Sequence, residues 1–96
     1  MWQVDIREQL VGAGLWNADD PRDPSKSEVA ANELRIRCEE TFHCELTHSG
    51  FWGAADSNWR VRIRGQSDIL GEAGNYQTAV CKAAIELHRR HGRERG

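Results

Sequence analysis

The stretch WRVRIRG at residues 59–65 decides the fold, because every second residue is apolar and the residues between them are arginines. The apolar set is Trp59, Val61 and Ile63, and the arginine row is Arg60, Arg62 and Arg64. Successive side chains of a strand point to opposite faces, so this pattern predicts a strand with one apolar and one charged face. We expect the apolar set to be buried and the arginine row to be largely exposed, because a one-residue slip would exchange the faces. One face of the sheet should therefore meet water or a partner.

Strands and helices are expected on both sides of this stretch. FHCELTH at 42–48 also alternates, a short strand is expected around 67–71, and 50–58 has the glycines of a loop. Helices are expected over 2–14, over about 27–41 and from Asn75 onward. Ser25 and Glu28 have the spacing of a capping box, and Asn75 is a favourable N-cap residue. The inward-facing positions of the second and third helices are Ala30, Ala31, Leu34 and Cys38, and Tyr76, Val80, Ala83, Ala84 and Leu87.

This order of elements predicts an α+β fold: a small three-stranded antiparallel sheet packed with two or three helices, in the order ααβββα. The 96 residues are expected to form a single domain, with an acidic loop at 17–27 and a frayed basic tail at 89–96. Residues 1–48 carry ten acidic and five basic side chains, and residues 49–96 carry five acidic and eight basic ones. Two faces of opposite potential would follow, or simply two solvated halves.

Metal and catalytic chemistry are not indicated by the histidines and cysteines. HCELTH lacks the His-Glu-x-x-His spacing of a zinc protease, and it is expected in a strand rather than a helix. A metal cluster of Cys38, His43, Cys44 and His48 is the alternative, but neighbouring strand residues point to opposite faces. Three scattered cysteines favour reduced thiols in a cytoplasm over a disulfide framework. We therefore expect no enzyme activity, no metal, no cofactor and no membrane contact.

The chain resembles two families. The order αβββα with a glycine-containing entry to an alanine-rich helix resembles the double-stranded RNA-binding domain, whose basic helix start is replaced here by Tyr76, Gln77 and Thr78. A closer resemblance is to the phage ABA-sandwich domain family, through DIREQLVGAGLW, DPSKSEVAANELRIRCEETF and GEAGNYQTAVCKAAIEL, in that order. This second resemblance implies a compact helix–sheet–helix domain and a phage accessory role, without a catalytic site.

Three features are candidates for contact with a partner. Phe51 and Trp52, in the expected loop, either fold back onto the core or form a hot spot, where tryptophan is enriched. The arginine row is either paired with Glu45 across the sheet or docked on an acidic surface. The acidic residues Asp19, Asp20 and Asp23 either form a solvated loop or compete with phosphate for a basic groove on a host protein.

The function predicted from these features is protein–protein binding by a small non-catalytic phage or prophage accessory protein. The expected role is inhibition of a bacterial defence complex, in the manner of an anti-CRISPR protein, in the cytoplasm of the host cell. The alternative is a nucleic-acid-binding module that uses the arginine row and the basic tail. The sequence leaves open which host complex is bound and whether the chain forms a homodimer.

Overall fold

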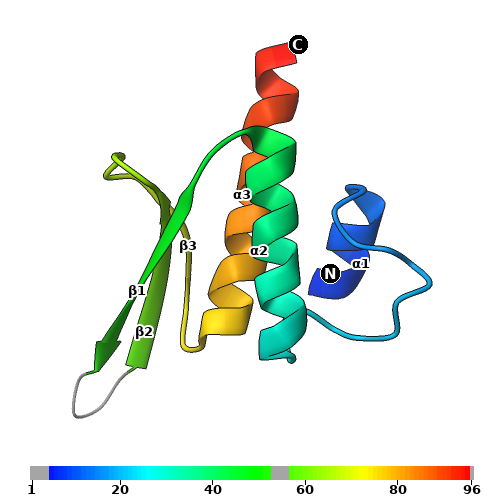
Figure 1. Cartoon of the computed structure of the whole chain (residues 1–96), viewed down its shortest axis with the longest axis horizontal. Coiled ribbons are helices and arrows are strands. Elements are labelled where there is room, and N and C mark those ends of the chain that lie inside the picture. Colours follow the sequence, from blue (N-terminus) through cyan, green and yellow to red (C-terminus); the bar gives the residue numbers. More distant parts are fainter. Residues whose placement is uncertain (1–4, 53–56, 96) are drawn as a thin grey trace, which may run out of the picture.

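The computed structural model describes residues 5–52 and 57–95, with side chains at 5–50 and 58–91. Within these residues the elements are α1 (Ile6–Gly12), α2 (Glu28–Phe42), β1 (Leu46–Trp52), β2 (Ser57–Ile63), β3 (Ile69–Ala73) and α3 (Tyr76–Arg95). The strands form one antiparallel sheet in the order β1-β2-β3 (Figure 1). The α+β class and the order helix, helix, sheet, helix are thus confirmed.

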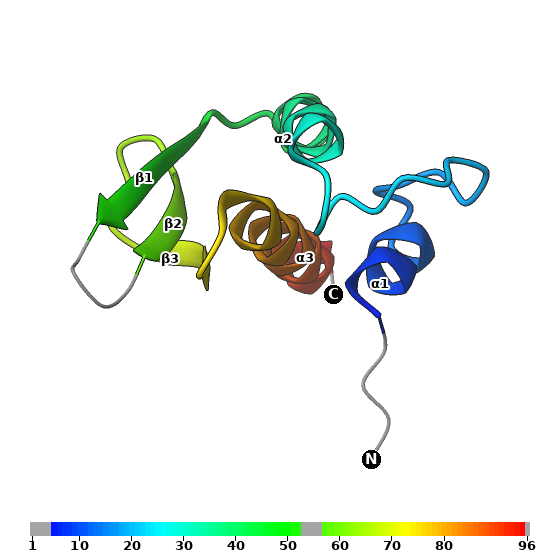
Figure 2. The same ribbon diagram turned by 90° about the horizontal axis from the view of Figure 1, so that it is seen from below.

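The central element of the core is α3. It contacts β3 and β2 on one side and α1 on the other, and α2 packs along it (Figure 2). No described helix covers the outer face of the sheet (Figure 2). The largest fully buried side chains are Leu10, Leu34, Val61, Val80, Pro24, Cys38 and Cys81. They come from the three described helices, from β2 and, for Pro24, from the connection between α1 and α2, so one core joins these elements. Among the described residues, no helix is long and apolar enough to cross a membrane.

The backbones of β3 and α3 approach each other most closely at Gly71. A Cβ atom there would lie 2.3 Å from the carbonyl oxygen of Ala79 and 2.6 Å from the backbone nitrogen of Ala83. Both alanines are fully buried, so small residues line this contact on the helix side. Gly71 is required because a methyl group would force the strand and helix backbones apart.

The alternating pattern of β2 is confirmed at its centre and weaker at its ends. Val61 is fully buried, and Arg60 and Arg64 are exposed. Trp59 and Ile63 are only half-buried, because they border hollows at opposite ends of the interface between sheet and helices. Arg62 is also half-buried rather than exposed, and the pairing of β2 with β3 is irregular between Val61 and Arg62. A bulge of this kind redirects side chains locally.

The first boundary that differs from the sequence prediction is the start of β1. The strand expected over 42–48 is wrong before Leu46, because α2 continues to Phe42. Phe42 lies one helical turn after the buried Cys38, so it satisfies the helical period as well as the alternating one. The helix ends at His43, which has the left-handed φ of 53°.

The loop expected over 50–58 is also shorter than predicted. The backbone of β1 runs through Phe51 and Trp52, and β2 begins at Ser57. Aromatic residues have a high strand propensity, and both continue the register against β2. The side chains of Phe51 and Trp52 lie outside the described residues, so the choice between core packing and a hot spot remains a prediction.

Two further differences concern helix ends. The N-cap of α2 is Ser27, whose hydroxyl accepts from the backbone N–H of Ala30 at 3.2 Å, so the capping box at Ser25 is wrong. The tail expected to fray from residue 89 continues as α3 to Arg95. Glu86 accepts hydrogen bonds from the two arginines that follow it at i+3 and i+4, and such pairs support a helix. The predicted cap at Asn75 is confirmed, because its Oδ1 accepts from Thr78 N at 2.8 Å.

Candidate binding site between β1, α2 and α3

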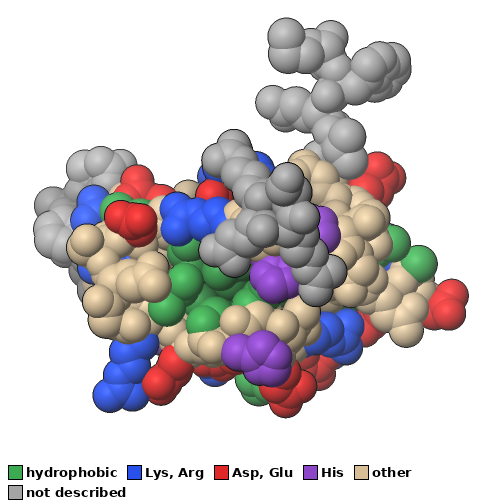
Figure 3. Space-filling model, turned by 90° about the horizontal axis from the view of Figure 1, so that it is seen from above, with side chains coloured by type: hydrophobic (Ala, Val, Ile, Leu, Met, Phe, Trp, Pro, Cys, Tyr) green, Lys and Arg blue, Asp and Glu red, His purple; other side chains and the backbone are tan. Residues whose placement is uncertain are grey.

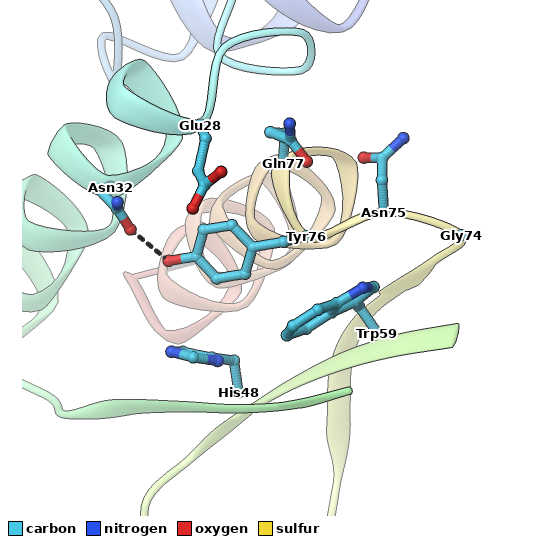
Figure 4. A pocket seen from close by; sticks show the side chains of 8 residues that line it. All are labelled: Glu28, Asn32, His48, Trp59, Gly74, Asn75, Tyr76 and Gln77. Carbon is cyan, nitrogen blue, oxygen red and sulfur yellow. Dashed lines mark hydrogen bonds between the residues drawn. The ribbon is translucent and has the colours of Figure 1, made fainter. Parts of the chain in front are cut away.

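A pocket of about 520 Å³ lies where the starts of α2 and α3 face the sheet (Figure 4). Its lining residues are Glu28, Asn32, His48, Trp59, Gly74, Asn75, Tyr76 and Gln77. They come from α2, β1, β2, the turn before α3 and the first turn of α3, so the pocket exists only in the folded chain. In Figure 1, β1 and α2 diverge from the connection that joins them, and the pocket lies between them at the wider end.

Three rings form the wall of the pocket. The ring of Tyr76 stands edge-on to His48 and to Trp59, with centroid distances of 4.9 Å and 5.6 Å and interplanar angles of 72° and 73°. The rings of His48 and Trp59 are 6.1 Å apart. The edge-on pairs have the geometry that aromatic rings prefer, so the wall is a stable cluster. None of the three side chains is fully buried, and each presents ring surface to the pocket.

The tilt of Trp59 toward β1 depends on the glycine opposite it. Gly50 pairs with Trp59 across the strands. A Cβ atom on Gly50 would lie 2.9 Å from the indole carbon Cη2. Glycine at this position leaves room for the indole ring to lie across β1 and reach His48.

Tyr76 is held by its position and by one hydrogen bond. It is the first residue of α3, directly after the N-cap Asn75. Its hydroxyl donates to Oδ1 of Asn32 on α2 at 2.6 Å (Figure 4). The ring therefore bridges α2, α3 and the sheet, and its orientation is fixed from both ends.

The charged side chain that lines the pocket is Glu28. It extends from the first turn of α2 toward the ring of Tyr76 (Figure 4). The first turn of α3 brings a partial positive charge of about half a unit, and the Asn75 side chain already satisfies one of its N–H groups. The start of α2 is capped in the same way by Ser27. The carboxylate is a full charge, whereas the two helix starts offer partial charges on N–H groups that are partly capped, so the pocket favours a positive group over a negative one.

The free edge of β1 borders the pocket. The backbone N–H of Arg64 donates to the carbonyl of Glu45 at 2.8 Å. This bond determines which residues of β1 pair with β2 through their backbone groups and which turn these groups away from β2. By this alternation the backbone groups of Leu46, His48 and Gly50 face the free edge. The N–H of Leu46 is covered by the Glu39 carboxylate at 2.9 Å. The edge-facing groups of His48 and Gly50 have no hydrogen-bond partner among the described residues.

The arginine row does not converge on this pocket, because it lies on the outer face of the sheet. Arg60 donates to the Glu72 carboxylate at 2.7 Å, and Arg64 donates to both oxygens of Glu45 at 3.0 Å. Pairing of the row with Glu45 was one of the two sequence-based alternatives, and the structure has it for Arg64. Hydrogen bonds from Asn58 and from Arg60 lower the pKa of Glu72. These ion pairs reduce the positive potential that the arginine row can offer to a phosphate backbone.

The acidic loop is held by arginines. Arg22 bridges Asp20 at 2.7 Å and Glu33 at 2.6 Å, and Arg7 donates to the carbonyl oxygen of Asp20 at 2.6 Å. The hydrogen bonds from Arg22 lower the pKa of Asp20 from 3.8 to about 2 and also lower that of Glu33. The guanidinium of Arg22 also lies over the ring of Trp16, a residue that is only 3% exposed. The loop is therefore anchored to the core.

The other two aspartates of this loop have different surroundings. The Oδ1 atom of Asp23 accepts from the hydroxyl of Ser25 at 2.6 Å and from its N–H at 2.9 Å, so Asp23 organises a turn. Asp19 is exposed, and its backbone N–H donates to the side chain of Asn17. Neither aspartate lines the aromatic pocket.

The cysteine side chains are buried in the core to different degrees. Burial raises the pKa of Cys38 and of Cys81 to about 12, and it also raises the pKa of the half-buried Cys44. Among the described residues, no group of three or more His, Cys, Asp or Glu side chains could hold a metal ion. His48, considered with the cysteines as a ligand, lies instead in the aromatic wall.

Another hollow lies near the other end of α3. Its volume is about 220 Å³, and it is lined by Phe42, Cys44, Ile63, Gln66, Leu87, Arg90 and His91. Figure 3 shows hydrophobic side chains gathered on this end of the molecule, with basic and histidine side chains beside them. The ring of Phe42 stands edge-on to His91 at 5.4 Å. This hollow is smaller than the first.

The aromatic pocket is not among the sites predicted from the sequence. Trp59 and Tyr76 follow the apolar period of their elements, so the sequence predicts both as core residues. Two signals were available in the sequence. His48 is in phase with the buried Leu46, and Gly50 leaves space where a strand normally carries a side chain. A polar ring on an inward-facing position next to a glycine indicates an incompletely filled interface.

Comparisons with models of protein families, with curated proteins and with solved structures found no match to this chain. The resemblance to the phage ABA-sandwich domain family therefore remains a prediction.

Proposed function

We propose that this chain is a non-catalytic protein that acts by binding another protein, in the role of a phage or prophage accessory protein that occupies a host complex. The observation that supports binding is the aromatic pocket beside the open edge of β1. The accessory role and the inhibition of a defence complex rest on the family resemblance alone.

The pocket and the edge together have the features of a site for an extended segment. An exposed strand edge offers backbone groups for pairing with another chain, and pockets beside it select side chains. Here the edge is open at His48 and Gly50, and the rings of Trp59 and Tyr76 lie next to it. Tryptophan and tyrosine are also the residues most enriched in the energetic centres of protein interfaces.

The experiment that tests this proposal is affinity capture from bacterial lysates with three forms of the protein. The wild type is compared with His48→Ala, which removes one ring of the pocket, and with His88→Ala, an exposed histidine on α3, as the matched control. We expect a protein partner that is retained by the wild type and the control and is lost with His48→Ala. Circular dichroism of all forms confirms that the fold is kept.

Two other results would contradict the proposal. Capture that is equal for all forms would place the binding surface elsewhere. Recovery of RNA or DNA, with affinity that falls steeply as salt rises, would favour the nucleic-acid alternative. Charge reversal of Arg60 and Arg64 would then test whether the arginine row is the contact.

A further inference from the structure

We infer that the pocket receives an arginine side chain of the partner, presented by an extended segment that pairs with the edge of β1 opposite His48. This inference rests on the proposed function and specifies the chemistry of the partner. The partner is then a protein with a basic residue in an exposed extended segment.

The first argument is the charge of the pocket. Among its lining residues the charged group is the carboxylate of Glu28, and none is a lysine or an arginine. The faces of aromatic rings carry negative potential and attract cations within about 6 Å of the ring centroid. The carboxylate and the rings of Trp59 and Tyr76 thus attract the same kind of group, a cation.

The second argument is the shape of a guanidinium. Arginine is planar, stacks on aromatic faces and donates two parallel hydrogen bonds to a carboxylate. In Figure 4 the Glu28 side chain extends toward the ring of Tyr76, so a guanidinium placed over this ring can pair with the carboxylate. The hydroxyl of Tyr76 is already bonded to Asn32 and the ring is held in place, so little reorganisation is needed.

The third argument is register. Directly opposed residues of paired strands point to the same face of a sheet. A residue of the partner that pairs with His48 would therefore place its side chain beside the His48 ring, which lines the pocket. Pairing cannot extend back to Leu46, because Glu39 already accepts its N–H. Along its length β1 diverges from α2 (Figure 1).

An anion is the competing occupant. The first turn of α3 lines the pocket, and helix N-termini attract negative groups. The position of Glu28 opposes this, since a bound carboxylate or phosphate would lie near a like charge. An acidic probe distinguishes the two possibilities directly.

The test uses a short blocked peptide of alternating threonine and valine with one central residue that is varied. The central residue is arginine, lysine, norleucine or glutamate, and binding to the full chain is followed by the NMR signals of the Trp59 indole and of β1. We expect the arginine peptide to bind at least about tenfold more tightly than the norleucine peptide, and the glutamate peptide to be weakest.

Two matched variants each remove a carboxylate charge from the first turn of a helix, at Glu28 in α2 and at Glu8 in α1. Glu28→Gln should weaken binding of the arginine peptide by about five- to tenfold and leave the norleucine peptide unchanged. Glu8→Gln likewise removes an acidic side chain from the first turn of a helix, here α1. It should change the binding of neither the arginine peptide nor the norleucine peptide. Glu28→Lys should reverse the ranking, so that the glutamate peptide binds more tightly than the arginine peptide.

Each opposite result overturns the inference. Equal binding of the arginine and norleucine peptides would reduce the pocket to an apolar contact, and tighter binding of glutamate would make it an anion site. The absence of binding by every peptide would remove the edge as a docking site. These outcomes differ from failure of the proposed function, which is decided by the loss or retention of a captured protein with His48→Ala.

Discussion

Replacement of Gly71 by alanine should strongly destabilise the fold, because it introduces an atom where two backbones meet. The added Cβ would lie 2.3 Å from the carbonyl oxygen of Ala79 and 2.6 Å from the nitrogen of Ala83. Real Cβ atoms essentially never approach another heavy atom to less than 3.0 Å. Both contacting atoms belong to the helix backbone, so no side-chain rotation relieves the clash. The strand or the helix must move by about 1 Å, and the pairing of β3 with β2 resists this.

The cost can be bounded from known effects of overpacking. One extra methylene in a packed core costs about 1–3 kcal/mol, and occasionally more, when neighbours can adjust. With only backbone on the helix side, we expect a value near the top of this range, about 3 kcal/mol. For a domain of this size that corresponds to a fall in Tm of roughly 12–24 °C.

The measurement is urea unfolding, followed by tryptophan fluorescence and by far-ultraviolet circular dichroism. Gly12→Ala is the matched control, because Gly12 ends α1 and a Cβ there would meet nothing within 4 Å. This control should be neutral or stabilise the fold by roughly 0.5–1 kcal/mol. If Gly71→Ala unfolds within about 0.5 kcal/mol of the wild type, the close approach of β3 to α3 is wrong, and with it the packing of the core.

Three further predictions concern single side chains. Because hydrogen bonds from Arg22 lower the pKa of Asp20 to about 2, its contribution to stability is present above about pH 4 and is lost as the pH falls toward 2. The difference in urea midpoint between wild type and Asp20→Asn should therefore shrink over that interval, and a constant difference would contradict the ion pair. Gly50→Ala should displace the indole of Trp59, seen as a shift of its NMR signal together with weaker peptide binding; an unchanged signal would contradict the assigned packing. Cys44 should react with a thiol reagent before the two fully buried cysteines, since only the latter need the core to open; equal rates would argue against this order of burial.

The class of the fold followed from the sequence because the patterns were clear in the middle of β2 and at the start of α3, whereas the strand expected around 67–71 lies at Ile69–Ala73. The alternation around Val61 and the cap at Asn75 each had one structural interpretation. The boundaries were less predictable because short apolar runs fit two periods. Phe42 fits both the helix that precedes it and the strand that follows, and only packing against the core decides between them.

The site was not predictable in the same way, because it depends on distances between elements. Trp59 and Tyr76 each follow the apolar period of their own element, which is the ordinary pattern of core residues. Both rings are accessible because α2 packs on α3 rather than against β1. The periodicity of a single segment does not encode which neighbouring element a helix packs on. One partner of the arginine row, in contrast, could be anticipated, because the alternation brings Glu45 and Arg64 opposite each other just outside the paired ends of β1 and β2.

Gly71 and Gly50, the two glycines in the described part of the sheet, have opposite consequences for the fold, and together they explain where the aromatic pocket lies. Gly71 removes a side chain so that β3 can meet α3 directly, which closes the core at that edge of the sheet. Gly50 removes a side chain so that the ring of Trp59 can lie across β1. At this opposite edge of the sheet, aromatic rings rather than a helix cover the inner face. The closed edge contributes stability, and the open edge leaves aromatic surface and backbone groups accessible beside the Glu28 carboxylate. A partner that pairs with this edge would cover the aromatic surface that α2 does not cover. Its binding should therefore stabilise the fold as well as recognise a side chain.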